Sequence, residues 1–161
     1  MQTFITTDAL DFKSIAKTLD NKRLNKQALE GWQILMTLLE LDPQGNPRTP
    51  KGWVNHPAVK MWRGHEGPLF DYIEAMVVEW KERGFNSTIL DKARSTMVVA
   101  NQTRDVSTTL PDWAQQETLK VIASTHRRAL LVKDYSWYSQ FHWPEDPGYP
   151  PTEYEYVWPV Q

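Results

Sequence analysis

The stretch LDNKRLNKQALE, residues 19–30, opens the longest helix that the early sequence predicts. Apolar or small side chains recur through it and beyond at i, i+4, i+7, i+11 and i+14, the spacing of a core-facing stripe. The stripe consists of Leu24, Ala28, Gly31, Leu35 and Leu38. The pattern therefore predicts a helix from about residue 20 to residue 41, which ends before Asp42-Pro43.

Polar side chains border this stripe. A second row, at i, i+4 and i+7, holds Arg23, Gln27 and Glu30, and Lys22 and Lys26 lie beside it. A carboxylate among cations, at the edge of an apolar face, is suited to acid–base chemistry. The alternative is a solvated helix face on which Lys26 and Glu30 form an ordinary i,i+4 ion pair. The stretch alone leaves both interpretations open.

Composition limits the class of protein. With 161 residues, 40% of them hydrophobic and 24% charged, the chain is expected to form one globular domain over residues 1–161. Eight Trp, six Tyr and five Phe form a large aromatic supply, which serves either a core or stacking on bases. The lack of Cys excludes disulfides and thiolate catalysis and fits a cytoplasmic protein. Neither a long apolar run nor a signal peptide is present, so no membrane association is expected.

Charge is distributed unevenly along the chain. The net charge is −2, but the last 18 residues hold four acids and no Lys or Arg, so residues 1–143 carry a net charge of +2. Basic side chains cluster between Lys13 and Lys26 and again between Lys120 and Lys133. An anionic partner is compatible with this distribution, although the net charge does not require one.

Helix-capping residues, the spacing of apolar residues, and Gly or Pro at helix ends predict the other helices. The expected helices are a short one from Phe12 to Leu19, and segments at residues 58–63, 69–83, 88–98, 112–133 and 135–141. A break is expected at Gly64–Pro68, and the tail from Pro144 is expected to pack as extended chain. The predicted fold class is all-α: a compact single-domain bundle of about four to six helices with long loops and an extended aromatic C-terminal tail.

Several kinds of catalytic site lack their residues in this sequence. His56, His65, His126 and His142 form no metal-ligand spacing, and no phosphate-binding glycine loop or serine elbow occurs, so neither metal nor cofactor is expected. Amines remain as nucleophiles, and α-amino groups lose their proton more readily than lysine side chains. An amine on Met1 beside Glu30 would attack a sugar carbon and form a Schiff base while the carboxylate moves protons. In most proteins, however, the N-terminal amine has no such role.

Two late features are ambiguous. The cluster Thr125-His126-Arg127-Arg128 suits phosphate contacts, but equally a solvated helix face. The aromatic run from Tyr135 to Trp143 is typical of a core, with a base-stacking platform as the alternative.

Four pieces of sequence stand in a specific order along the chain. They are Leu24 followed by Glu30, the segment from His56 to Val59, WKERGFN at residues 80–86, and THRRALLVK running into DYSWYSQF at residues 125–141. Together they resemble the phage pyrimidine-dimer DNA glycosylase/AP lyase family, also called phage endonuclease V. The start MQTF, the segment NHPAVKMWRG and the late YVWP are similar to uncharacterised bacterial and phage relatives of that family.

The resemblance implies a compact all-α fold with the N-terminus near the active site. Such enzymes flip a nucleotide out of the duplex, attack C1′ with the α-amine, release the damaged base and cut the backbone by β-elimination. Carried over, Glu30 falls on the catalytic glutamate, and Arg23 falls on a position near the DNA. His126 and Arg127 fall around a cation that contacts the backbone. Lys22, Lys26, Gln27 and Arg63 are also expected to bind DNA. The implied partner is double-stranded DNA with a damaged or modified base, bound by a monomer.

One departure concerns the nucleophile. The family exposes its amine by removing the initiator Met ahead of a small residue, whereas Gln2 is large and normally prevents removal. The expected catalytic residues are therefore Met1, Glu30 and Arg23. The net charge of −2 is a second departure, because enzymes that search DNA generally carry a net positive charge. The alternatives are a non-catalytic DNA-binding module of the same fold and a protein-interaction domain whose Trp-rich tail covers a partner site.

Overall fold

The stretch at residues 19–30 opens helix α2, Asn21–Leu39, in the computed structural model, which describes residues 1–160. Asp20 caps the helix by accepting a hydrogen bond from the backbone N–H of Arg23, and Glu40 ends it in the left-handed conformation with φ of 56°. Leu24 and Leu35 are fully buried, as the predicted stripe requires. The helix prediction is confirmed to within two residues at each end.

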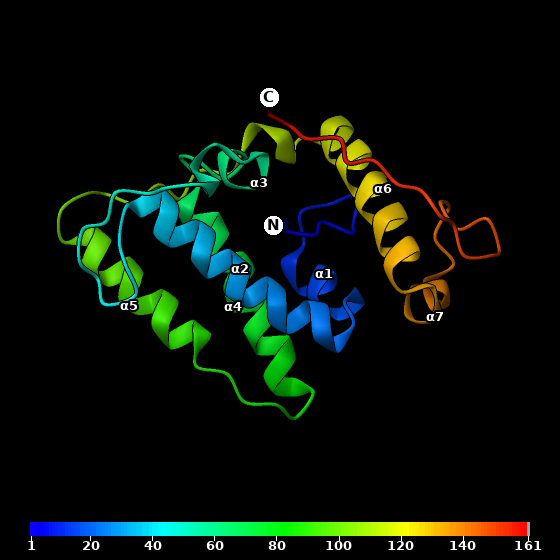
Figure 1. The fold of residues 1–161 in the computed structure, drawn as a ribbon, viewed down its shortest axis with the longest axis horizontal. Coiled ribbons are helices and arrows are strands. Elements are labelled where there is room, and N and C mark those ends of the chain that lie inside the picture. The colour runs from blue at the N-terminus through cyan, green and yellow to red at the C-terminus, as the bar shows by residue number, and fades with distance from the viewer. Residues whose placement is uncertain (161) are drawn as a thin grey trace.

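The described residues form an all-helical fold without β-strands, which confirms the predicted fold class (Figure 1). Besides α2, the α-helices are α1 (Phe12–Thr18), α3 (Pro57–Lys60), α4 (Glu66–Glu82), α5 (Ile89–Asn101), α6 (Gln116–Lys133) and α7 (Tyr135–Tyr138). Short 3-10 turns occur at Trp53–Asn55, Asp112–Ala114 and Ser139–Phe141. The two shortest α-helices have only four residues each, so five longer helices make up the bundle. No helix within residues 1–160 is long and apolar enough to cross a lipid bilayer.

Helix α2 lies at the centre of the bundle and packs most extensively against α4, with α5 beside it (Figure 1). Gly31 permits the close approach, because a Cβ at that position would lie 2.7 Å from Cγ1 of Ile73 in α4. Helix α4 begins at Glu66, inside the segment where a break was predicted, so that part of the prediction is wrong. Proline is tolerated there because Pro68 lies in the first turn, where the helix needs no N–H.

The first six residues lie between α2 and α6 and form no helix or strand (Figure 1). The backbone N–H of Phe4 donates to Oε1 of Gln27 in α2 at 2.7 Å, and that of Ile5 donates to Nδ1 of His126 in α6 at 2.8 Å. Ile5 is fully buried. The N-terminus is thereby built into the core, and it joins the two sides of the bundle.

The tail from residue 144 onward contains no helix in the described residues and follows α6 (Figure 1). Thr125 and Arg128 of α6 hold its backbone through the N–H of Val157 and the carbonyl oxygen of Glu153. Trp158 reaches the ring of His56, with 5.7 Å between the ring centroids. The predicted extended path is present, and it returns the end of the chain to the neighbourhood of its beginning.

Candidate functional site

Glu30 and Gln27 hold the first residues of the chain against α2. The backbone N–H of Gln2 donates to Oε2 of Glu30 at 3.3 Å, and the amide nitrogen of Gln27 donates to the same oxygen at 3.2 Å and to the carbonyl oxygen of Gln2 at 2.9 Å. Three covalent bonds separate the amine of Met1 from the nitrogen of Gln2, so that amine is within about 7 Å of Oε2 of Glu30. The fold thus places the N-terminal amine within about 7 Å of the predicted acid.

The buried side of this arrangement is closed by Tyr72 of α4. Its hydroxyl lies 2.8 Å from Oε1 of Gln27 and 2.9 Å from the carbonyl oxygen of Phe4, and its single hydrogen is shared between them. Burial raises the pKa of Tyr72 well above its usual range, and the charge of Glu30 raises it further. Tyr72 therefore stays protonated and acts as a fixed donor behind the acid.

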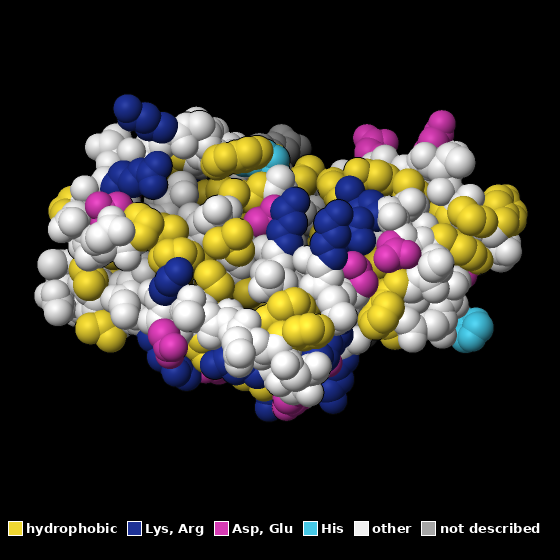
Figure 2. All heavy atoms as spheres, turned by 60° about the horizontal axis from the view of Figure 1, so that its bottom comes forward, with side chains coloured by type: hydrophobic (Ala, Val, Ile, Leu, Met, Phe, Trp, Pro, Cys, Tyr) yellow, Lys and Arg dark blue, Asp and Glu magenta, His cyan; other side chains and the backbone are white. Residues whose placement is uncertain are grey.

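A cavity of about 320 Å³ opens in front of the acid. Its lining joins the N-terminus, the polar edge of α2, the end of α6 and the tail: Met1, Gln2, Phe4, Lys22, Arg23, Lys26, Gln27, Glu30, Lys133, Tyr154 and Tyr156. Five of the predicted site residues from α2 and the predicted nucleophile Met1 are among them. On the face drawn in Figure 2, Lys and Arg side chains gather near the middle among hydrophobic ones, which suits the approach of an anionic polymer.

The cations of α2 differ in how firmly they are held. Arg23 pairs with Asp20 at 3.3 Å and its side chain is mostly covered. Lys26 is 3.9 Å from Oε1 of Glu30, and its side chain is 64% exposed, so this contact is weak and easily exchanged. Lys22 is exposed. Both lysines are free to turn toward a phosphate.

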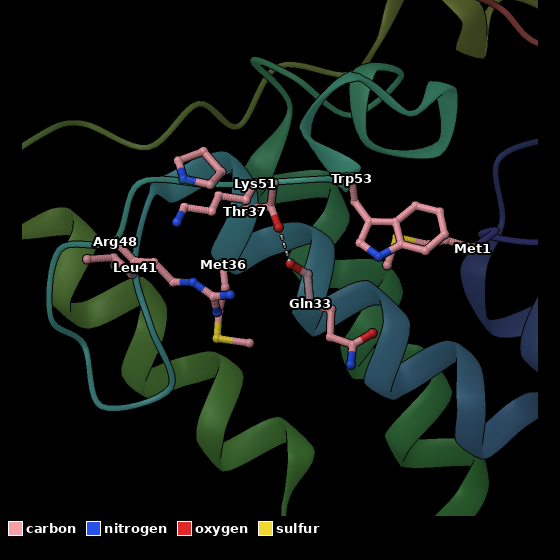
Figure 3. Close-up of a pocket in the computed structure, with 9 residues that line it drawn as sticks. Met1, Gln33, Met36, Thr37, Leu41, Arg48, Lys51 and Trp53 are labelled. Carbon is pink, nitrogen blue, oxygen red and sulfur yellow. Dashed lines mark hydrogen bonds between the residues drawn. The ribbon is translucent and has the colours of Figure 1, made fainter.

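A second cavity, of about 220 Å³, is also lined by Met1 (Figure 3). It is lined by Met1, Gln33, Met36, Thr37, Leu41, Arg48, Pro50, Lys51 and Trp53. Figure 3 shows the ring of Trp53 beside the Met1 side chain. Met1 therefore lines two cavities, one bordered by α2 and the tail and the other by α2 and the loop that follows it.

His56 lies near the N-terminal amine. Burial lowers its pKa, and the positive charge of the N-terminal amine lowers it further, so the ring lies within electrostatic reach of that amine. Its Nδ1 accepts the N–H of Ala58 at 3.0 Å. The rings of Trp53 and Trp158 lie against it at 5.1 and 5.7 Å. The His56 segment singled out in the sequence is thus next to the candidate site.

His126 and Arg127 lie in the protein interior in this structure. Burial lowers the pKa of His126 to about 3, so the ring is neutral, and its Nε2 has no hydrogen-bond partner. Arg127 is 8% exposed, binds both carboxylate oxygens of Glu145 at 2.7 and 2.9 Å, and reaches Asp8 at 3.0 Å. Although burial lowers the pKa of Arg127, its hydrogen bonds to Glu145 and Asp8 raise it overall. These contacts tie the tail and the N-terminal segment to α6, and DNA binding by the two residues stays a prediction.

Arg63 lies outside the cavity lining and donates to the carbonyl oxygen of Val54 at 2.9 Å. Sequence reasoning missed Gln2, Tyr154, Tyr156 and Trp53 as neighbours of the site. The only signal for Gln2 was its place in the MQTF start, and nothing in the order of the chain connects the tail tyrosines with α2. Within residues 1–160, no group of three or more His, Asp or Glu side chains is arranged to hold a metal ion.

Comparison of the sequence with protein-family models gives a match. The family model described as pyrimidine dimer DNA glycosylase matches residues 1–93, which is more than half of the chain. The matched part includes Met1, Glu30 and His56, and it ends within α5. Searches among curated proteins and among solved structures gave no match. The family implies DNA glycosylase activity and binding of damaged DNA, and on the strength of this match the chain belongs to the pyrimidine dimer DNA glycosylase family.

Proposed function

We propose that the protein excises damaged or modified pyrimidines through a Schiff base on the α-amine of Met1, and that it then cleaves the DNA backbone as an AP lyase. The observation that carries this proposal is the hydrogen bond from the backbone N–H of Gln2 to Oε2 of Glu30, 3.3 Å long. It holds the first residue of the chain beside a carboxylate that lines a cavity with several cations.

The chemistry divides between the amine and the acid. The neutral amine attacks C1′ of the target nucleotide, the bond from C1′ to the base breaks, and the base leaves with its electron pair and takes up the proton that the amine nitrogen loses. The bond from C1′ to O4′ then breaks, O4′ takes up a proton, and the nitrogen lone pair forms the C=N bond of the Schiff base. Glu30 stabilises the positive charge that develops on the sugar. Its carboxylate then accepts a proton from C2′, the bond from C3′ to oxygen breaks, and water hydrolyses the remaining Schiff base.

Lys22, Arg23 and Lys26 are proposed to hold the phosphates next to the target nucleotide. They lie on the two turns of α2 that precede Glu30, and all three line the cavity. Binding of this kind is independent of sequence and weakens with added salt. The proposed domain is the whole of residues 1–161, because Lys133, Tyr154 and Tyr156 from beyond the matched segment complete the cavity.

Borohydride trapping tests the proposal. Incubation with DNA that contains an abasic site is expected to give a covalent adduct, located by peptide mass spectrometry on the N-terminal residue. An adduct on a lysine, or one that survives acetylation of the α-amine, would remove Met1 from the mechanism.

Glu30→Gln tests the acid. The variant keeps the oxygen that the N–H of Gln2 binds, and it removes the proton acceptor. We expect its rate to fall by about 10²-fold or more, the usual contribution of a general acid–base group. Glu82→Gln is the matched control, because Glu82 is exposed at the end of α4 and is not among the residues that line the cavity. Equal rates for Glu30→Gln and the wild type would exclude the proposed role. DNA binding without cleavage by the wild type would favour a non-catalytic module.

A further inference from the structure

Gln2 is fixed in the wall of the cavity by its backbone. Its N–H donates to Oε2 of Glu30 at 3.3 Å, and its carbonyl oxygen accepts from Nε2 of Gln27 at 2.9 Å. The residue is only 6% exposed. Its backbone therefore occupies a defined place directly beside the acid, and its side chain is covered.

The orientation of the Gln2 amide follows from its hydrogen bonds. Oε1 accepts the backbone N–H of Thr3 at 2.8 Å, so the oxygen is engaged and the nitrogen is directed elsewhere. This nitrogen, Nε2, is buried and has no hydrogen-bond partner. The hydroxyl of Tyr156 lies close to this amide. Burial raises the pKa of Tyr156, and the Gln2 amide lowers it by a smaller amount. Nε2 of Gln2 and this hydroxyl do not, however, meet hydrogen-bonding geometry. Buried donors without a partner are rare in native proteins, and each needs an explanation.

The residues around the cavity indicate which kind of acceptor would form a hydrogen bond with Nε2 of Gln2. Gln2 lines the same cavity as Met1 and Glu30, and the cations there are the groups proposed above to hold the phosphates. A neutral amide N–H₂ group is instead suited to a neutral oxygen, and pyrimidine bases present carbonyl oxygens on their edges. Glu30 is not this acceptor in the structure, because Nε2 of Gln2 has no hydrogen-bond partner.

We propose that Gln2 is a specificity-determining residue whose Nε2 donates a hydrogen bond to a carbonyl oxygen of the damaged pyrimidine. This inference rests on the proposed function, since it takes the cavity beside Met1 and Glu30 as the place where the target nucleotide binds. It predicts that Gln2 matters for a substrate that carries its base and not for one that has already lost it. A purely structural amide would affect both substrates equally.

The test compares two duplexes of the same sequence, one with a thymine dimer and one with an abasic site. Gln2→Met removes both polar atoms at a similar length and adds no charge. Gln2→Glu keeps the oxygen that Thr3 binds and replaces the donor nitrogen by an oxygen, but it also adds a negative charge near Glu30. Both replacements are large, so Met1 is retained as in the wild type. Gln116→Met, at an exposed position at the start of α6, is the control.

We expect kcat/KM on the dimer duplex to fall by about tenfold or more in both variants, the usual effect of losing one specific base contact. On the abasic duplex, kcat/KM of Gln2→Met should stay within about threefold of the wild type, since no base remains there to bind. A similar loss on both duplexes in Gln2→Met, or none on either, would overturn the inference and assign the amide to the protein's own backbone.

Failure of the proposed function itself gives a different result. If the wild type neither cleaves nor traps either duplex, the catalytic proposal is wrong. The dissociation constants of the two duplexes are then compared in the same variants, because turnover no longer disturbs the measurement. Loss of the preference for the dimer in Gln2→Glu and Gln2→Met would still support the inference, and an unchanged preference would overturn it.

Discussion

Nε2 of Gln27 donates a hydrogen bond to Oε2 of Glu30 across 3.2 Å, from one turn of α2 to the next. The same amide accepts the N–H of Phe4 through Oε1 and donates to the carbonyl oxygen of Gln2. One buried side chain therefore fixes both the acid and the extended segment that carries the N-terminus. This relationship, more than any charge on the surface, gives the candidate site its geometry.

Gln27→Leu is expected to destabilise the fold and to displace the N-terminus. The replacement leaves the N–H of Phe4, the carbonyl oxygen of Gln2 and the hydroxyl of Tyr72 with fewer partners in a buried place. At about 1–3 kcal/mol for each unsatisfied group, the free energy of unfolding should fall by about 3 kcal/mol or more. Urea denaturation measures this loss. Gln33→Leu, at an exposed position of the same helix, should change it by less than about 0.5 kcal/mol.

Lys26→Ala is expected to weaken DNA binding and to lower its salt dependence. If Lys26 neutralises one phosphate, the slope of log K against log salt should decrease by about 0.9. Fluorescence anisotropy over a range of salt concentrations gives this slope. Lys120→Ala removes an exposed lysine of α6 that does not line the cavity, and its slope should match the wild type. Equal slopes for the two variants would contradict the phosphate role of Lys26.

Arg127→Met is expected to lower the free energy of unfolding by about 3–5 kcal/mol, because it leaves the carboxylate of Glu145 in a covered position without its bidentate partner. Adding Glu145→Gln should recover part of the loss. Arg94→Met breaks an exposed ion pair with Glu74 and should cost only about 0–1 kcal/mol. Thermal or urea unfolding distinguishes the two cases. Equal effects would show that burial does not decide the strength of these pairs.

His126 is expected to make the fold sensitive to acid. Its pKa is about 3 in the folded protein because burial disfavours the charged ring, whereas an unfolded His titrates near 6.5, so the unfolded state binds a proton first. The stabilisation is fully present above pH 6.5 and is lost as the pH falls from 6.5 toward 3. Between pH 7 and pH 5 this loss is about 2 kcal/mol.

Urea unfolding at several pH values checks the sensitivity. His126→Gln should abolish most of this pH dependence, although it also reduces stability through lost packing. His142→Asn is the control, because His142 is exposed and its φ of 50° suits asparagine. A pH dependence that is unchanged in His126→Gln would assign the acid sensitivity to other groups.

Local sequence determined the helices. The spacing of Leu24 and Leu35 specified which side of α2 faces the core, and Asp20 and the Asp42-Pro43 pair bounded the helix. These signals act over a few residues through hydrogen bonds and burial, so they can be read in order along the chain. The start of α4 was misjudged because a proline in a first turn does not end a helix.

The placement of charges was less predictable. Arg127 and Lys26 are both basic residues of amphipathic helices, yet Arg127 is buried in ion pairs and the Lys26 side chain is 64% exposed. The difference arises from Glu145 and Asp8, which lie far from Arg127 in sequence. A helix pattern shows which side chains share a face, but it does not show what covers that face.

The sequence by itself determined an all-helical chain with an acid at the edge of a core stripe, and it carried the residues that match the family. Only the tertiary structure decided that the first residues lie on Glu30 and Gln27, that Nε2 of Gln2 is buried without a hydrogen-bond partner, and that Tyr154 and Tyr156 line the same cavity as Glu30. The physical reason is separation along the chain. Tyr154 and Tyr156 are more than 120 residues from Glu30, and packing of side chains around a shared core, which no local pattern encodes, brings them together.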